Sequence, residues 1–404
     1  AFDAILDDPS AEFPVFTVPR NPVSTADYVA GLHAASLIRD GGTLQIGIGS
    51  LGDAVTYALI LRHRHNALFR ELLARITDEQ RETAPFEEGL YASSEMFVDG
   101  FLDLYDAGIL KRRSASGPVL HSAFFAGSRD FLNRLKAMPE ERRRDFDMTA
   151  VSFTNALYGG EEEKRRDRVH ARFLNNAMKV DVLGAAQSDT LGDGRVVSGV
   201  GGQHDFVEQA LALRGANSVI MVHSHRISDG EAEPNIVWQL DRTTIPRHMR
   251  DVVVTEYGVA WLKGASDGEC IERMAAIADH RFAKDLIAKA RSAGKLAKGV
   301  EVHAGANRPE RLRDLLAGPR RDGFFPDFPF GSDFTSEERT ALKALSHLKQ
   351  CGHSKTALAR TFASGLFARP DASQQAALDR LEIGTGIKDR VYRALLLGAW
   401  RAAG

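Results

Sequence analysis

The feature that most constrains the fold is a glycine-rich turn between a short apolar run and an amphipathic run. Residues 43–48 are apolar, the turn follows as Gly47-Ile-Gly-Ser-Leu-Gly52, and residues 53–60 have helical spacing. A buried strand, a tight turn and a helix in this order form one unit of an α/β fold. The sequence therefore predicts a sheet whose strands alternate with helices.

The same alternation continues along the chain. Further strands are expected at residues 90–98, 119–125, 148–153, 218–223 and 251–256, and helical segments at 25–39, 61–88, 129–146 and 206–213. A turn at Gly192-Asp-Gly194 between apolar runs indicates a hairpin over residues 180–200, and the chain is expected to turn helical after Gly258. We therefore predict an α/β fold with an open mixed sheet flanked by helices.

Composition divides the chain into three parts. Residues 1–24 are acidic and contain several prolines, which is typical of a linker, here from an N-terminal domain that we expect to be missing. Residues 25–300 hold the alternating strands and helices. After residue 300 the chain is richer in Arg, Ala and Leu, so residues 301–404 are expected to form a helical C-terminal extension.

Charge and cysteine content exclude several classes of protein. The net charge of −2 over 404 residues provides no overall attraction to nucleic acid or anionic lipid. Cys270 and Cys351 have neither disulfide-framework nor metal-site spacing, and no run of about 18 apolar residues or basic leader is present. The sequence predicts a cytoplasmic protein without a nucleic-acid partner, a membrane partner or a bound metal.

The first glycine turn has three interpretations. Gly47, Gly49 and Gly52 match the GxGxxG pattern, whose backbone N–H groups bind pyrophosphate in dinucleotide-binding proteins. The acidic residue that such a site needs about 20 positions later is Glu71, inside a helical run, which disfavours a nicotinamide or flavin cofactor. A purely structural turn, or one edge of another active site, fits better.

Two further features could carry chemistry. The cluster Gly199-Val200-Gly201-Gly202-Gln203 places closely spaced N–H groups between a strand and a helix, where they can form an oxyanion hole or only a tight turn. Glu95 lies at the end of an apolar strand, as a nucleophile or as a solvated or capping residue. A Glu nucleophile needs no general base because it is ionised at neutral pH.

The remaining candidates favour structural roles. Glu256 follows a buried strand, and we interpret it first as a structural carboxylate. The pairs His63/His65 and His223/His225 lack the third ligand of a metal site, so solvated or hydrogen-bonded histidines are expected.

Four segments in the same order resemble the acetyl-CoA hydrolase/transferase family, which includes 4-hydroxybutyrate CoA-transferase and succinyl-CoA:acetate CoA-transferase. They are Gln45-Ile-Gly-Ile-Gly-Ser-Leu-Gly-Asp-Ala-Val55, Ser94-Glu-Met-Phe-Val-Asp-Gly100, Ser198-Gly-Val-Gly-Gly-Gln-His-Asp-Phe206 and Val254-Thr-Glu-Tyr-Gly-Val-Ala260. The resemblance covers about residues 15–300 and corresponds to the C-terminal half of the family.

This resemblance implies a CoA-transferase-like fold and a role for each motif. Glu95 would attack an acyl-CoA thioester and then carry CoA as a glutamyl thioester until a small carboxylate accepts it. Residues Gly199–Gln203 would bind the oxyanion and CoA, and Gly47, Gly49 and Gly52 would line the same cleft. Coenzyme A would be a substrate, with no permanently bound cofactor, and a homo-oligomer is expected.

Two alternatives to a transferase stay open. Water in place of the carboxylate acceptor would make the chain an acyl-CoA hydrolase that uses the same Glu95. An acyl-CoA-binding module without covalent chemistry is favoured if a missing N-terminal half supplies essential residues.

Overall fold

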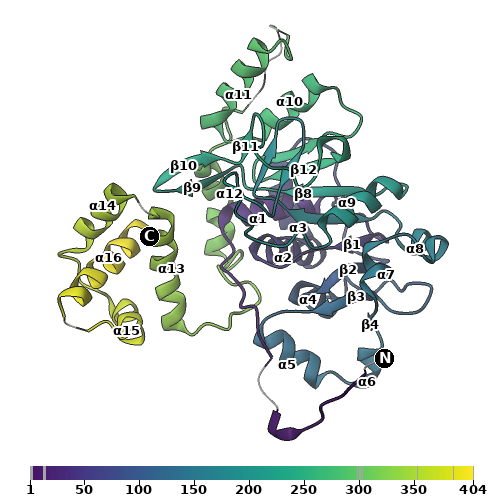
Figure 1. The fold of residues 1–404 in the computed structure, drawn as a ribbon, viewed down its shortest axis with the longest axis horizontal. Helices are drawn as coiled ribbons and strands as arrows, with labels where there is room; N and C mark the ends of the chain where they lie inside the picture. The colour runs from purple at the N-terminus through teal and green to yellow at the C-terminus, as the bar shows by residue number, and fades with distance from the viewer. Residues whose placement is uncertain are drawn as a thin grey trace.

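An eight-stranded sheet forms the centre of the computed structural model, which describes residues 3–11, 15–297, 299, 302, 304–352, 354–384 and 386–403 (Figure 1). Its strand order is β13-β12-β8-β5-β1-β2-β3-β4, and every neighbouring pair is parallel except β12–β13. The strands are β1 (Thr43–Gln45), β2 (Tyr91–Phe97), β3 (Leu120–Phe125), β4 (Phe146–Met148), β5 (Arg172–Asn176), β8 (Asn217–Met221), β12 (Val252–Thr255) and β13 (Gly258–Trp261). The predicted open mixed sheet is confirmed.

Both faces of the sheet are covered because successive side chains of a strand point to opposite sides. In β8, Val219 and Met221 enter one apolar core and Ile220 enters the other. The first core packs β-strand residues against α1 (Thr25–Ala35), α2 (Ser50–Arg64), α3 (Asn66–Ala74), α4 (Asp99–Asp106), α5 (Arg129–Ala137) and α12 (Pro309–Arg321). The opposite face packs against α9 (Gln203–Ala212), α10 (Asp267–Ala276) and α11 (His280–Ser292).

The remaining elements are short. They are η1 (Pro9–Ala11), α6 (Glu140–Arg143), α7 (Val151–Asn155), α8 (Glu161–Asp167), η2 (Arg247–Met249), a sheet of β11 (Ile236–Val237), β6 (Lys179–Asp181) and β7 (Ala186–Gln187), and the hairpin of β9 (His225–Ser228) and β10 (Glu231–Pro234).

Three predicted elements differ from the structure. The predicted strand at 148–153 is wrong because the chain leaves β4 at Met148 and forms α7, whose carbonyl groups are bound by side chains of other elements. The predicted hairpin over 180–200 reduces to the β6–β7 pair, and only an isolated bridge joins Thr190 to Val196. After Gly258 the chain first forms β13, since the tight turn at Glu256–Tyr257 returns it along β12.

The segment between α3 and β2 has little regular structure, yet polar contacts fix it. The Asp40 carboxylate accepts hydrogen bonds from the backbone N–H groups of Glu87, Glu88 and Gly89. The fully buried Arg62 guanidinium donates to the carbonyl of Ala84 and to two carbonyls after α1 or at its end. These contacts hold residues 75–89 against the body of the molecule.

The described residues before α1 cross the carboxyl ends of the strands. Val18 N–H donates to the Gly127 carbonyl, and the buried Arg20 guanidinium pairs with Asp53, Asp99 and Asp103. Ser24 then begins α1 through a capping box. Residues 15–23 are therefore a strap tied to α2 and α4.

The C-terminal helices form a separate bundle beside the sheet (Figure 1). The bundle consists of α13 (Ser336–Cys351), α14 (Lys355–Gly365), α15 (Ala372–Arg380) and α16 (Ile387–Ala403). It has its own apolar core and meets the body at the β9–β10 hairpin, where Gly230 N–H donates to the Gln350 carbonyl. By contrast, α12 and Phe325 pack into the first core of the sheet. The boundary expected at residue 300 stays a prediction.

Candidate active site

Glu95 lies near the carboxyl end of β2, two residues before the strand ends at Phe97. Its side chain is partly buried, and its backbone carbonyl accepts a hydrogen bond of 3.2 Å from Ser122 Oγ on β3. Ligands of open α/β sheets bind at this end of the strands. Glu95 is therefore placed where substrate chemistry is expected.

Asn155 is the polar partner of Glu95. Its Nδ2 donates to Glu95 Oε2 at 2.8 Å and to Asp205 Oδ2 at 3.1 Å. Thr154 Oγ1 lies 2.9 Å from Asn155 Oδ1 and donates to it, which leaves the amide nitrogen facing the two carboxylates. Sequence reasoning missed Asn155 and Asp205, because a single Asn in a segment interpreted as a strand carries no motif.

The second glycine cluster reaches Glu95 through two of its members. A Cβ atom on Gly202 would stand 2.3 Å from Glu95 Oε2 and 2.6 Å from Asn155 Nδ2, and one on Gly201 would stand 3.9 Å from both Glu95 oxygens. The glycine backbone can approach the carboxylate this closely only because it lacks a side chain. Gly201 also has φ +56°.

The other members of that cluster lie farther out. Gly199 and Val200 are exposed on the loop. Gln203 begins α9, and its Nε2 donates to the Asn176 carbonyl at 3.2 Å. The structure thus brings together Glu95, Gly201 and Gly202, while contacts of Gly199, Val200 and Gln203 with Glu95 stay a prediction.

The first glycine turn faces a different group of residues. Gly49 has φ +99° at the start of α2, and a Cβ atom on Gly52 would stand 2.3 Å from the Gly47 carbonyl oxygen. The turn lines a pocket of about 80 Å³ together with Arg20 and Asp53. Burial raises the pKa of Asp53 to about 7 in spite of the nearby Arg20 charge. Glu95 does not line this pocket, so the predicted shared cleft stays a prediction.

The largest cavity, of about 1000 Å³, lies between α5 and the ends of β2, β3 and β4. Its walls include Phe97, Phe125 and Met148. Glu95 is absent from its lining, so this cavity does not define the candidate site.

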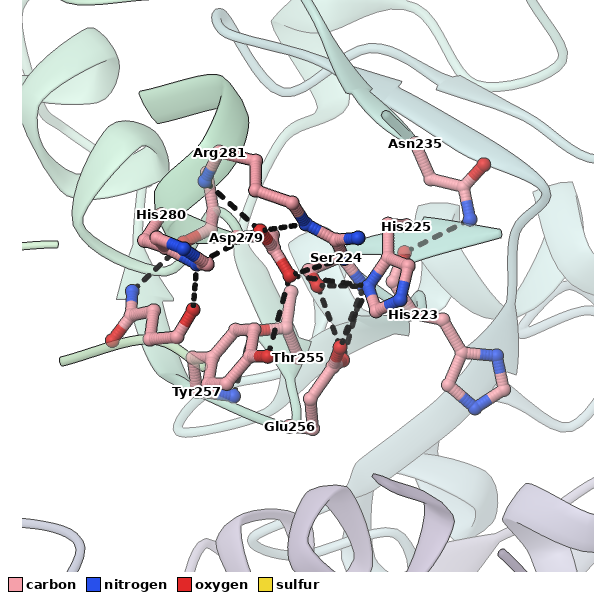
Figure 2. A network of polar contacts seen from close by, with 12 residues as sticks. His223, Ser224, His225, Asn235, Thr255, Glu256, Tyr257, Asp279, His280 and Arg281 are labelled. Carbon is pink, nitrogen blue, oxygen red and sulfur yellow. Dashed lines mark hydrogen bonds and ion pairs between the residues drawn. The ribbon is translucent and has the colours of Figure 1, made fainter. Parts of the chain in front are cut away.

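Glu256 belongs to a second polar network, shown in Figure 2. Its carboxylate is 1% exposed and accepts hydrogen bonds from Ser224 N–H at 3.0 Å and Ser224 Oγ at 2.6 Å. Four strand spacings separate β2 from β12, about 19 Å, so Glu256 and Glu95 do not form a carboxylate pair.

The predicted histidine pair of that segment is hydrogen-bonded within the same network (Figure 2). His223 Nε2 lies 2.9 Å from Asp27 Oδ1, and this contact raises the pKa of His223 against the opposing effect of burial. His225 Nδ1 lies 3.4 Å from Asp279 Oδ2, and burial lowers the pKa of His225. The part of the chain that the structure describes holds no group of three His, Cys, Asp or Glu side chains arranged for a metal ion.

Comparison with known protein families assigns the segment around this site. A model of the acetyl-CoA hydrolase/transferase C-terminal domain matches residues 127–290, which include Asn155, Gly201 and Gly202. This segment is an acetyl-CoA hydrolase/transferase C-terminal domain. The domain model begins after β3, so Glu95 and β2 precede the matched residues.

Curated relatives of this domain extend the match to more of the chain. A 4-hydroxybutyrate coenzyme A transferase from Clostridium kluyveri is 28% identical over 69% of the chain and 57% of its own length. A succinyl-CoA:acetate/propanoyl-CoA:succinate CoA transferase from Fasciola hepatica is 27% identical over 65% of the chain and 49% of its own length. The chain therefore spans about half the length of the curated relatives that it matches.

Solved structures of acetyl-CoA hydrolase/transferase relatives agree with the fold. A 4-hydroxybutyrate CoA-transferase from Porphyromonas gingivalis superposes with a TM-score of 0.51 at 25% identity, over 70% of this chain and 58% of that one. RipA from Yersinia pestis gives a TM-score of 0.56 at 24% identity, over 70% of this chain and 56% of that one, which supports the fold alone.

No helix among the described residues combines the length and apolar character needed to span a bilayer.

Proposed function

We propose that the chain carries the Glu95 half of a CoA-transferase active site and that Glu95 is the nucleophile. The observation that carries this proposal is the Glu95 carboxylate at the end of β2, hydrogen-bonded by Asn155 and packed against Gly202. The names of the relatives, which are CoA-transferases and acetyl-CoA hydrolases, support the same chemistry.

The first half of the proposed reaction loads CoA onto Glu95. A Glu95 carboxylate oxygen attacks the thioester carbon of an acyl-CoA, the C–S bond breaks, and CoA leaves as a thiolate. The thiolate then attacks the Glu95 carbonyl carbon of the mixed anhydride. This step forms the glutamyl-CoA thioester and releases the acyl group as a carboxylate.

The second half reverses these steps with a different carboxylate, so that no net proton or redox change occurs. The acceptor carboxylate displaces CoA from Glu95 to give a new anhydride, and CoA then takes the acyl group and frees Glu95. Backbone N–H groups at Gly201 and Gly202 would stabilise the oxyanion of each tetrahedral intermediate. The Asn155 amide would keep one Glu95 oxygen in place while the other attacks.

Hydrolysis is the second candidate, because three of the relatives are named acetyl-CoA hydrolases. Water would then resolve the same intermediate. Rates measured with and without a short-chain carboxylate separate the two, since only the transferase requires the carboxylate for turnover. The acyl donor, the homo-oligomeric state and the cytoplasmic location stay predictions.

The test of the nucleophile is a covalent adduct. The protein is incubated with acetyl-CoA, and its intact mass is expected to rise by the mass of CoA less one water. Glu95→Gln is expected to lose the adduct and keep CoA binding measured by calorimetry, because the amide has the same size but is not a nucleophile. Glu208→Gln, an exposed Glu on α9, serves as the matched control and should form the adduct.

Two results would contradict the proposal. An adduct in Glu95→Gln would place the nucleophile elsewhere. CoA binding without an adduct in the unaltered protein would favour the acyl-CoA-binding module.

A further inference from the structure

The helix that presents Asn155 to Glu95 is too short to hold itself. Helix α7 has five residues, and isolated helices of this length are unstable in water. The last carbonyl groups of any helix also lack partners within the helix. The position of Asn155 therefore depends on whatever binds the carbonyl groups of α7.

Three buried side chains bind those carbonyl groups. Lys164 Nζ donates to the carbonyls of Ser152 at 3.3 Å, Ala156 at 2.8 Å and Tyr158 at 3.0 Å. Arg168 Nη2 donates to the Phe153 carbonyl at 2.6 Å. Gln209 Nε2 donates to the carbonyls of Thr154 at 3.2 Å and Asn155 at 2.7 Å.

The three side chains form one connected unit, here called the α7 frame (Lys164, Arg168 and Gln209). Arg168 Nη1 donates to Gln209 Oε1, so the guanidinium fixes the orientation of the amide that holds Asn155. Arg168 is 1% exposed, Lys164 is 2% exposed and Gln209 is 3% exposed. Lys164 and Arg168 also face the Phe153 ring, at 4.9 and 5.7 Å from its centroid.

Neither cation of the α7 frame has an acidic partner within hydrogen-bond distance among the described residues, which is unusual for such buried charges. Burial lowers the pKa of Arg168 to about 10, so Arg168 remains charged at neutral pH. An uncharged side chain would cost far less to bury. Two cations that bind only the carbonyl groups of a one-turn helix indicate that the exact placement of this helix matters.

We propose that Lys164, Arg168 and Gln209 are positioning residues of the active site, which act through α7 to hold the Asn155 amide against Glu95. The inference rests on the proposed function for its catalytic consequence. Its structural part, the contact between Asn155 and Glu95, can be measured without turnover.

The test compares Gln209→Met with the unaltered protein. Methionine has about the volume of glutamine but neither donates to α7 nor accepts from Arg168. A crystal structure of Gln209→Met is expected to show Asn155 Nδ2 moved out of hydrogen-bond distance of Glu95 Oε2. Formation of the Glu95 adduct at saturating acetyl-CoA is expected to slow by about 10- to 100-fold, with the dissociation constant of CoA unchanged.

Two further variants separate positioning from general loss of stability. Gln209→Glu keeps the acceptor for Arg168 but turns a carboxylate towards two carbonyl groups, so it should be as slow as Gln209→Met. Arg62→Met is the matched control, because Arg62 is also a fully buried arginine that binds three carbonyls, on α2 and away from Glu95. It should lower the melting temperature and leave both the Asn155–Glu95 contact and the adduct rate intact.

The outcomes are distinct. If the contact persists in Gln209→Met, or if the contact is lost and the adduct forms at the unaltered rate, the inference is overturned. An Arg62→Met variant that slows the adduct as strongly as Gln209→Met also overturns it. If the contact is lost but the unaltered protein itself forms no adduct, the positioning role holds and the proposed function falls.

Discussion

At the scale of single residues, Gly202 is the position where the site tolerates least. We predict that Gly202→Ala slows adduct formation by about 100-fold, because the new methyl group would displace the Glu95 carboxylate and the Asn155 amide. Gly199→Ala is the control in the same loop, since its Cβ atom would meet nothing closer than 3.9 Å. Equal rates in the two variants would show that the Gly202–Glu95 approach is not required.

Asp53 gives the chain a pH dependence that can be isolated. In the unfolded chain an Asp is ionised above a pH of about 4, whereas burial in the folded state raises its pKa to about 7. The folded state therefore holds a proton between these values, and the stability that this proton contributes is lost as the pH rises through 7.

We predict that lowering the pH from 8 to 6 increases the free energy of unfolding of the natural chain by about 1 kcal/mol more than that of Asp53→Asn. Urea denaturation at the two pH values measures the difference. A pH response that is identical in the two proteins would mean that Asp53 titrates normally in the folded state.

The sequence could predict Glu95 and Gly202 but not Asn155. Glu95 and Gly202 lie in motifs whose residue types have few other uses at a strand end. Asn155 acts through a contact between residues 60 positions apart, and the side chains that hold it come from α8 and α9 and the residue after α8. Such long-range polar contacts leave no periodic pattern in the chain.

At the scale of elements, the buried strands were predictable because their apolar runs are continuous. Strands β8 and β12 form where β-branched residues are buried on both faces. The same reasoning failed at residues 148–153, since Val151 and Phe153 favour a strand locally while Lys164, Arg168 and Gln209 stabilise a helix. Tertiary contacts decide the structure of so short a segment.

Helices α14 and α16 cross at two glycines that face each other's backbone. A Cβ atom on Gly398 would stand 1.8 Å from the Thr361 carbonyl oxygen, and one on Gly365 would stand 1.8 Å from that of Ala394. We predict that Gly398→Ala destabilises the bundle by about 1–3 kcal/mol, because the two helices must separate. Hydrogen exchange in α14 and α16 measures the effect.

A matched glycine makes this prediction specific. Gly318 lies inside α12, and a Cβ atom at this position would meet nothing within 4 Å, so Gly318→Ala should stabilise its helix through better helix propensity. Faster exchange in α14 and α16 for Gly318→Ala, or unchanged exchange for Gly398→Ala, would contradict the proposed role of the crossing.

At the scale of the whole molecule, the two-faced sheet and the helical bundle have separate cores. We predict that a chain ending at Gly331 keeps the unfolding transition of the sheet, because only the β9–β10 hairpin loses contacts. A chain ending at residue 300 should be several kcal/mol less stable, since it lacks Leu312, Leu315, Leu316 and Phe325 from the first core.

Calorimetry of the two shortened chains tests this division. Equal stability of both would place the boundary at residue 300, as composition alone suggests. Composition detects the change to Arg, Ala and Leu along the chain, but it does not detect that α12 returns to pack on α1.

The Asp40 and Arg62 contacts have a consequence for how the molecule is degraded. Residues 75–89 form a long surface segment between α3 and β2 with little regular structure, the kind of stretch at which nicking usually begins. A protease must bind its substrate in an extended form, and these residues cannot extend while Asp40 holds three of their N–H groups and Arg62 holds the Ala84 carbonyl. Cleavage within this segment therefore has to wait for local unfolding of the turn after α1.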